Sequence, residues 1–520
     1  MTRPTPSHIT GLGDPLPREV IGVDSDPEAV ERAIERVSLE GTKEAPPHLT
    51  VTDFFSCRPS TRSFANRLDA EILPSVDAVV GNPPYIRYHG FRGPVRSSAA
   101  AAVADQQIRL TDLTSSWAPF VVHATSFLKP GGRLAFVLPA ELLSVDYARA
   151  IRDFLAVAYK SITIIAFDER VFPGVLADTV LVLADKQGAE AGLALVRLQN
   201  LSQLPQTSAD LRRGAWVPFP DSEPKWSSLI LEPSAREVYR VCDTLDGVSR
   251  LGASMSVDIG VVSGNNDFFV LTQQQLQGSR IPREEVIPIV SSSRHLKGAR
   301  VGAAEFDEIR ESGQRCWLLN LAGRVKISDE ARVYLSSAGK RGTQSRYKVR
   351  TRRRWFDVPS VYAPDAFMSY FISEAPRFVV NAVGATSTNT IHRLRRAGGD
   401  PHATVPLILS CYSTLTQLSA EVEGRSYGGG VGKLETKEAE SLRLVRPNTL
   451  AAKELRQAEA KIHGLLRSGS TSEATEIVDE LLLEGQLGLS PTRIQLLKGG
   501  LVSLRSRRKS RMSGGPSRND

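Results

Sequence analysis

Apolar residues in the first third of the chain form short runs that alternate with stretches of helical spacing. The runs are rich in Val, Ile and Leu, which is typical of strands buried in a sheet. In chain order, the pattern predicts strand 20–24, a helix from residue 28, strands 49–52 and 76–80, a helix over 112–128, strand 133–139, a helix over 146–158, and strands 162–167 and 179–183. Strands that alternate with helices predict an α/β fold.

The patterning changes after this α/β region. Several Pro, Gly, Ser and Gln residues are typical of a linker, short apolar segments separated by turns predict a mixed α+β domain, and later apolar residues recur at helical spacing. One strand–turn–strand hairpin is predicted over Val257–Leu271. The predicted parts are an irregular lead-in (1–18), an α/β domain (19–186), a linker and connecting region (187–249), a mixed α+β domain (250–450), a helical segment (451–498) and a basic disordered tail (499–520).

Length, charge and cysteine usage narrow the class of protein. The 520 residues are enough for several domains of about 150 residues each. No apolar run is long enough to cross a membrane and no signal-peptide pattern is present, so we expect no membrane association. The four cysteines are isolated, which favours a reducing cytoplasm over a disulfide framework or a zinc site. The net charge of +8 is compatible with a polyanionic partner.

The most informative stretch is Asn82-Pro83-Pro84-Tyr85, which follows the predicted buried strand 76–80. Two prolines cannot continue a ladder, so we expect a stiff loop at the carboxyl edge of the sheet, where α/β folds bind ligands. The Asn82 amide oxygen and the Pro83 carbonyl are two acceptors that match the two hydrogens of an exocyclic amino group. Held in this way, the nitrogen would aim its lone pair at an electrophilic methyl group, while a base stacks on Tyr85.

Two earlier strand ends carry acidic residues. Asp24 ends the first strand, where nucleotide-binding α/β folds hold ribose hydroxyls, and Asp53-Phe54 follows the second. An ordinary helix-capping acid is the alternative for Asp24. The order of these motifs before Asn82-Pro83-Pro84-Tyr85 resembles the adenine-N6 DNA methyltransferases of the gamma, or Taq-type, class, which occur as type II restriction-modification methylases.

The resemblance implies a class I S-adenosylmethionine-dependent methyltransferase (Rossmann-like) domain with S-adenosylmethionine as cofactor. In this family Asp24 would hold the ribose, Asp53 would accept from the adenine amino group of the cofactor, and Phe54 would pack on its ring. Asn82 also belongs to the implied cofactor site.

The same resemblance assigns catalysis to Asn82, Pro83, Pro84, Tyr85 and Phe172. Asn82 and Pro83 would hold N6 of a flipped adenine, and Tyr85 and Phe172 would clamp the base. Phe172 stands in the turn Val171-Phe172-Pro173, and a core phenylalanine is the alternative. The implied reaction is direct methyl transfer without a metal.

One family element is missing from its expected place. The family begins its sheet with a strand and a glycine-rich loop that approaches the methionine part of the cofactor. Here only Thr10-Gly11-Leu12-Gly13-Asp14 precedes Asp24, without an apolar strand before it or room for a helix after it. We therefore expect an N-terminally truncated catalytic domain, and the cofactor affinity of this chain becomes a question for experiment.

The region 250–450 resembles the target-recognition domains of type II modification methylases, whose hairpins enter the major groove of double-stranded DNA. Residues 341–354 hold seven basic side chains and no acidic one. This run predicts phosphate contacts, with a solvated loop as the alternative. The residues predicted to bind DNA are Arg346, Lys348, Arg350, Arg352, Arg353 and Arg354.

Together these features predict a monomeric, cytoplasmic, site-specific adenine-N6 DNA methyltransferase that flips its target base. It would act as the modification part of a restriction-modification or phage-defence system, in some cases beside a cognate restriction endonuclease. Alternatives remain: a protein-glutamine or ribosomal RNA N-methyltransferase, a fused restriction-modification enzyme, and a catalytically silent DNA-binding remnant of such an enzyme.

Overall fold

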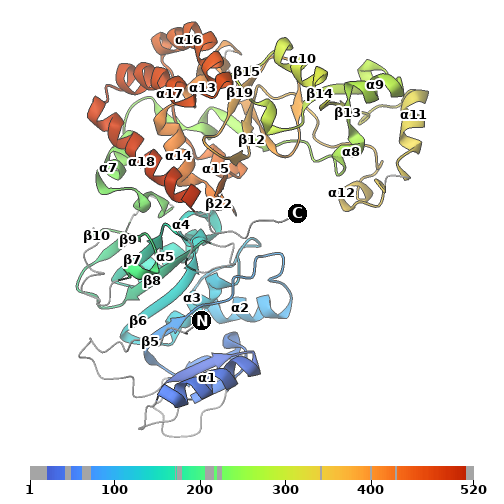
Figure 1. Ribbon diagram of the computed structural model, residues 1–520. Helices are drawn as coiled ribbons and strands as arrows, with labels where there is room; N and C mark the ends of the chain where they lie inside the picture. Colours follow the sequence, from blue (N-terminus) through green and yellow to red (C-terminus); the bar gives the residue numbers. More distant parts are fainter. Residues whose placement is uncertain are drawn as a thin grey trace, which may run out of the picture. The chain divides into compact units, whose positions relative to one another are not determined.

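The chain forms two compact units. The computed structural model describes residues 20–40, 48–60, 72–169, 171, 178–204, 216–219, 225–339, 342–398, 401–427 and 430–510 (Figure 1). The first unit comprises Met1–Ile230 with Ser513–Asp520, and the second comprises Leu231–Met512. Residues Gly11 and Gly13 of the predicted lead-in lie outside the described part.

The first unit opens with a small parallel sheet. Strands β1 (Ile21–Asp24) and β2 (His48–Val51) pair in parallel, and the helix α1 (Pro27–Glu40) connects them. A second parallel pair follows, formed by β3 (Arg58–Ser60) and β4 (Ile72–Pro74). The predicted strand–helix–strand order over this segment is confirmed.

A six-stranded sheet forms the centre of this unit, with the strand order β10-β9-β7-β8-β6-β5 (Figure 1). β5 pairs with β6 and β7 with β9 in parallel, whereas β8 lies antiparallel between β6 and β7. This arrangement confirms the predicted α/β, class I methyltransferase-like domain. The strands are β5 (Val76–Gly81), β6 (Leu128–Pro139), β7 (Ser161–Phe167), β8 (Thr179–Asp185), β9 (Gly192–Leu198) and β10 (Trp216–Val217).

Helices pack on one face of the six-stranded sheet. The buried side chains of α3, α5, β6, β7 and β8 form one continuous apolar core, which includes Trp117, Leu138, Leu155, Ile164 and Val182. Burying this apolar surface is the main source of stability of the unit. The helices are α2 (Pro94–Ala104), α3 (Trp117–Ser126), α4 (Glu141–Ser144) and α5 (Arg149–Ala158).

The exposure of β5 corrects one prediction. β5 was predicted to be a buried strand, but Val80 is 79% exposed and Asp77 and Ala78 are exposed as well. β5 lies at the edge of the sheet and pairs only with β6 among the described strands. An apolar run therefore marked the strand correctly, but it did not fix how deeply the strand lies.

The predicted linker over 187–249 contains strands. β9 pairs with β7 along its whole length, and β10 extends the sheet beyond β9. Gly192, with φ of 111°, begins β9, and a Cβ there would lie 2.2 Å from the carbonyl oxygen of Val217. The interpretation of this segment as a linker is wrong for β9 because its polar flanks outweighed its apolar centre, Gly192–Leu198.

The described residues of the second unit form two larger sheets and two smaller ones. The strand orders are β12-β21-β17-β19-β15 and β13-β16-β14-β20, with β11-β24 and β18-β23-β22 as the small sheets. The bounds are β11 (Val248–Arg250), β12 (Met255–Ile259), β13 (Val270–Thr272), β14 (Val286–Val290), β15 (Arg300–Val301), β16 (Arg315–Leu319), β17 (Ala366–Ser369), β18 (Phe371–Ile372), β19 (Phe378–Asn381), β20 (Thr386–Ser387), β21 (Ile391–Arg396), β22 (Arg425–Tyr427), β23 (Val431–Lys433) and β24 (Arg443–Val445).

The hairpin predicted over Val257–Leu271 does not form. β12 pairs with β21, and β13 pairs with β16, so the two strands belong to different sheets. The polar residues between them are interior: the side chains of Ser263 and Asn265 are buried. Local turn chemistry predicted the turn, but long-range pairing decided the partners.

Helices complete the second unit, and the last of them corrects the predicted disordered tail. α18 continues to Ser510, and its residues Leu497, Leu501, Leu504 and Arg508 are buried at helical spacing. The bounds are α7 (Pro233–Cys242), α8 (Asn266–Phe269), α9 (Gln273–Ser279), α10 (Ala303–Glu311), α11 (Asp329–Ser336), α12 (Tyr347–Arg350), α13 (Thr404–Ser410), α14 (Thr414–Glu423), α15 (Thr436–Glu440), α16 (Thr449–Ser468), α17 (Thr471–Asp479), a π-helical turn (Glu480–Gln486) and α18 (Pro491–Ser510).

Candidate active site and nucleic-acid interface

The loop Asn82–Tyr85 begins where β5 ends at Gly81, as the two prolines predicted. A Cβ at Gly81 would come 2.9 Å from the Phe136 ring, so glycine lets the end of β5 lie close to β6. Pro83 is buried and Asn82 is exposed. The loop is therefore anchored by a proline while its amide side chain reaches solvent.

Tyr85 is half-buried and packs against the core of the sheet. Its hydroxyl lies 2.9 Å from the carbonyl oxygen of Val137 and 3.0 Å from Asn82 Oδ1. Burial raises the pKa of Tyr85 to about 12, so the phenol stays neutral at physiological pH. An amide oxygen has two lone pairs, so a bond from Tyr85 leaves Asn82 Oδ1 able to accept a further hydrogen.

Ser116 fixes the second half of the loop. Its hydroxyl donates to the Pro84 carbonyl at 2.5 Å and accepts from the Ile86 amide at 2.9 Å. Its own amide donates to the Ile86 carbonyl at 3.0 Å. Because Ser116 is 1% exposed and precedes α3, these bonds fasten the loop to a packed helix.

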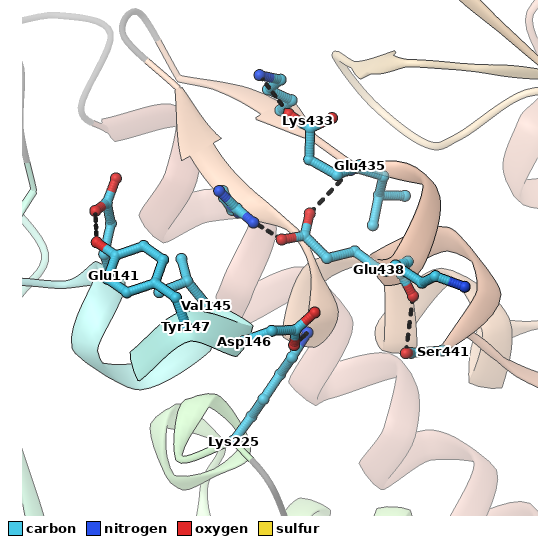
Figure 2. Close-up of polar contacts among 12 residues, drawn as sticks. Glu141, Val145, Asp146, Tyr147, Lys225, Lys433, Glu435, Glu438 and Ser441 are labelled. Atoms are coloured by element: carbon cyan, nitrogen blue, oxygen red, sulfur yellow. Dashed lines mark hydrogen bonds and ion pairs between the residues drawn. The ribbon is translucent and has the colours of Figure 1, made fainter. Parts of the chain in front are cut away.

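A partly buried polar network lies beside Ser116. The Tyr147 hydroxyl donates to Glu141 at 2.7 Å (Figure 2), lies 3.2 Å from Ser115 Oγ, and accepts from the Trp117 indole at 3.2 Å. Burial, together with the Glu141 charge, raises the pKa of Tyr147, so the phenol remains a donor. A network in which each polar side chain has a hydrogen-bond partner holds the backbone around it in one arrangement.

Asp24 and Asp53 both lie at strand ends and both are exposed. Asp24 Oδ1 accepts from the Asp26 amide at 2.9 Å, and Asp53 Oδ1 accepts from the Phe55 amide at 3.1 Å. Each carboxylate thus caps a local turn through one oxygen. Within the described residues no hydrogen bond reaches the second oxygen of either side chain, and a carboxylate oxygen of this kind can accept from a ribose hydroxyl or an amino group.

Phe54 belongs to a cluster of aromatic rings. It stacks on Phe120 at 5.5 Å between ring centroids, and His123 and Phe127 lie at 4.8 and 5.6 Å. His123 Nε2 lies 3.0 Å from the Phe54 carbonyl oxygen. Burial lowers the pKa of His123, so the ring is neutral at physiological pH. Phe54 is half-buried, so part of its surface stays open to a ligand.

Phe172, predicted to clamp the base, lies outside the described residues. The predicted cofactor residues offer two exposed carboxylates, an exposed amide and an aromatic surface, all in the first unit, and these are the kinds of group that bind an adenosine-like ligand. No cluster of His, Cys, Asp or Glu suited to a metal ion occurs within the described ranges. Among the described helices, none combines the length and hydropathy of a membrane span.

The basic run 342–354 divides into two groups of side chains. Arg352 donates to the carbonyl oxygens of Val262 and Ser263, at 3.1 and 2.7 Å. Arg354 pairs with Asp357 and donates to the carbonyl oxygens of Leu321 and Arg324. Both guanidinium groups bind other residues of the second unit. The geometry therefore does not support the prediction that Arg352 and Arg354 contact phosphates.

The other predicted DNA-binding residues are placed differently. Arg346, Lys348, Arg350 and Arg353 are all exposed. Their side chains remain candidates for phosphate contacts.

Sequence reasoning missed Ser116 and the carbonyl of Val137 as parts of the site. A serine before a helix is a common capping residue, so Ser116 carried no signal of a loop that lies 32 positions away in the sequence. A backbone carbonyl leaves no mark in a sequence at all.

Two family descriptions match this chain. Residues 18–172 match the Eco57I restriction-modification methylase family, and residues 223–483 match the C-terminal domain of the Type II methyltransferase M.Eco57I.

Individual relatives are more distant. Type II methyltransferase M.XamI of Xanthomonas campestris pv. amaranthicola is 27% identical over 380 residues, and M.AccI of Acinetobacter calcoaceticus is 18% identical over 368 residues. These matches cover 71% and 69% of this chain and 67% of each relative. A solved complex of the Type IIL restriction-modification enzyme MmeI with DNA matches with a TM-score of 0.48 and 14% identity, over 84% of this chain and 60% of that one.

Proposed function

The chain belongs to the Eco57I-type restriction-modification methylases, and from this premise we propose that it moves a methyl group from S-adenosylmethionine to N6 of an adenine flipped out of double-stranded DNA. The relatives named above are Type II methyltransferases, so methyl transfer to DNA is the activity of the family. The choice of N6, the flipped base and the site residues are our proposal.

The observation that carries the proposal is the fixed loop Asn82–Tyr85. Ser116 occupies the Pro84 carbonyl, whereas no hydrogen bond reaches the Pro83 carbonyl from the described residues. Asn82 Oδ1 and the Pro83 carbonyl therefore remain as two acceptors on a stiff backbone. A rigid pair of acceptors stabilises charge that develops on an amino nitrogen during attack, without reorganisation at the moment of reaction.

Tyr85 would meet the base with the exposed part of its ring. Its hydroxyl is held by Val137, so the ring has one orientation, and an ordered ring loses less entropy when a base stacks on it. Stacking is worth roughly 1–3 kcal/mol per base, which offsets part of the cost of flipping. Phe172 would pack on the other face of the base, as the family resemblance implies.

S-adenosylmethionine supplies the electrophilic methyl group. Asp24 would accept from its ribose, Asp53 from its adenine amino group, and Phe54 would cover part of the adenine ring. These roles agree with the exposed carboxylates and the half-buried ring. The second unit would bind the DNA duplex, and we propose that the protein works as the modification part of a restriction-modification system.

The test is modification-sensitive sequencing of DNA from a methylation-free host that expresses this chain. We expect N6-methyladenine confined to one short sequence motif. The matched control is Asn82→Ala, which should leave the DNA unmodified at the same level of soluble protein. Methyl groups on another atom, or an unchanged pattern in the Asn82→Ala host, would contradict the proposal.

The alternatives predict other outcomes in the same host. A protein-glutamine or ribosomal RNA methyltransferase would leave the DNA unmodified and label protein or ribosomal RNA. A catalytically silent DNA-binding protein would bind duplex DNA but show no heat of binding on titration with S-adenosylmethionine.

A further inference from the structure

We propose that Tyr347, together with Arg346, Lys348, Arg350 and Arg353, forms a surface of the second unit that binds the sugar–phosphate backbone of duplex DNA. We call this set of five residues the α12 surface. The inference rests on the proposed function in one respect only, because it takes duplex DNA as the partner. It assigns a role to Tyr347 and removes Arg352 and Arg354 from the DNA-binding set.

The short helix α12 presents an aromatic ring to solvent. Tyr347 is 64% exposed, whereas Val349, two residues later, is fully buried. Lys348 Nζ lies 5.7 Å and the Arg350 guanidinium 5.6 Å from the centroid of the Tyr347 ring. Two cations at such distances interact favourably with the ring and keep it among positive charges.

The α12 surface packs on an interior that hydrogen bonds and close contacts hold in place. Asn265 donates to Thr343 Oγ1 at 2.9 Å, and both side chains are buried. Arg352 bonds to the carbonyls of Val262 and Ser263 and lies over the Phe269 ring at 5.5 Å. Gly264, with φ of 78°, approaches the helix so closely that a Cβ would meet Val349 at 2.7 Å. A surface fixed in this way loses little entropy when it binds.

The positive charge of the α12 surface indicates which kind of partner it binds. Residues 342–354 contain no acidic side chain, and the next acid in the sequence, Asp357, is paired with Arg354. A protein partner of mixed charge would not need this excess of cations. The regularly spaced phosphates of a duplex would need such an excess, and the release of counterions from the duplex drives association. Tyrosine suits the same partner, because its hydroxyl can donate to a phosphate while its ring packs on a sugar.

The experiment measures duplex affinity of the full chain at several salt concentrations. One variant carries Arg346→Gln, Lys348→Gln, Arg350→Gln and Arg353→Gln. The control carries Arg240→Gln, Arg310→Gln, Arg332→Gln and Lys437→Gln. These four cations, of which Arg310 is half-buried and the others exposed, each pair with an acid three residues away on the same helix. Both variants lose four positive charges, so the change in net charge is the same, and the thermal unfolding of each variant accounts for the ion pairs that the control breaks.

We expect the slope of log affinity against log salt to flatten by about 0.9 for each phosphate that the first variant no longer neutralises. The control should keep the slope of the unsubstituted chain. Tyr347→Ala should weaken binding at least about fivefold at fixed salt without changing the slope, and Tyr347→Phe should restore part of the affinity. Thermal unfolding of every variant checks that the fold is kept.

Equal slopes in the α12 variant and the control would overturn the inference, and so would unchanged affinity after Tyr347→Ala. A chain that methylates DNA with an unaltered slope after the α12 substitutions refutes this inference alone. A chain that binds duplex DNA through these side chains and never methylates it keeps the α12 surface and refutes the proposed function. Absence of any duplex binding refutes both.

Discussion

The loop Asn82–Tyr85 and the basic run 342–354 are both short, and both stand out in the sequence. They differ in how well the sequence tells which of their groups bind inside the unit and which remain free. In the loop, the order of residues determines which groups are bound inside the unit and which remain free. In the basic run, arginines that look equivalent in the sequence are placed differently: Arg352 bonds to two backbone carbonyls of the unit, whereas Arg353 is exposed.

The difference comes from the backbone. Two prolines restrict the loop so strongly that few arrangements are open to it. A run of arginines leaves each side chain free to reach either inward to a carbonyl or outward to solvent, and the rest of the fold decides. A motif that constrains its own backbone predicts a site better than a composition does.

Substitution of Asn82 should give the largest effect. Asn82→Ala removes one of two acceptors for the attacking amino group, so we expect the rate of methyl transfer to fall at least about 100-fold. DNA affinity should change little, because the side chain is a small part of the duplex interface. Single-turnover methyl transfer and duplex binding measure the two quantities. A parallel decrease in both would show that the loop binds DNA and does not carry the chemistry.

Ser116 should give the next largest effect, through the position of the loop. Ser116→Ala leaves the Pro84 carbonyl and the Ile86 amide without their side-chain partner, and we expect kcat to fall about tenfold with KM little changed. Ser116→Thr keeps the hydroxyl and should recover most of the rate. The control is Ser115→Ala, at the neighbouring buried serine whose hydroxyl faces Tyr147. Equal kcat values for Ser116→Ala and the unsubstituted chain would remove Ser116 from the site.

Arg352 and Arg353 should separate stability from DNA binding. Arg352→Gln should lower the free energy of unfolding by about 1–3 kcal/mol, because the carbonyls of Val262 and Ser263 lose a charged donor. Arg353→Gln should leave stability unchanged and flatten the salt dependence of DNA binding. Denaturant unfolding and binding at two salt concentrations test the pair. The assignment of Arg352 to stability and of Arg353 to DNA binding is wrong if Arg352→Gln flattens the salt dependence and leaves stability unchanged.

His123 should give the smallest effect. Burial lowers its pKa, so between the unfolded value near 6.5 and the lower folded value, the unfolded chain binds a proton that the folded chain does not. The contribution of His123 to stability is therefore present above about pH 6.5 and is lost as the pH falls through the folded pKa. His123→Gln should narrow the difference in Tm between pH 7.5 and pH 5.5. An unaltered difference would assign the pH response to other groups.

Much of the first unit could be predicted because its strands and helices follow one another locally. The strand that ends at Asp24, the helix after it, and the strand before Asn82 all form close to where the apolar pattern placed them. The exposure of Val80 could not be predicted, because it depends on what covers the sheet and not on the strand itself.

The second unit was harder to predict, since its pairings join distant segments. Val257 and Leu271 lie in neighbouring apolar runs but in different sheets. The same holds for the candidate site: Asn82 and Tyr85 were predicted from the sequence, whereas Ser116 and the Val137 carbonyl reach the loop that holds them only through the fold. Pairings between distant segments leave no local pattern to detect.

The buried end of α18 has a consequence for how the chain folds as it is made. Arg508 is 6% exposed and binds Glu421 through two hydrogen bonds of 2.8 Å, and its guanidinium also donates to the carbonyls of Ile372 and Gly430. α18 also packs against α7, the first helix of the unit, at Gly500, where an added Cβ would lie 3.4 Å from the Cβ of Ala235. The second unit therefore cannot complete its packing during synthesis until α18 has left the ribosome.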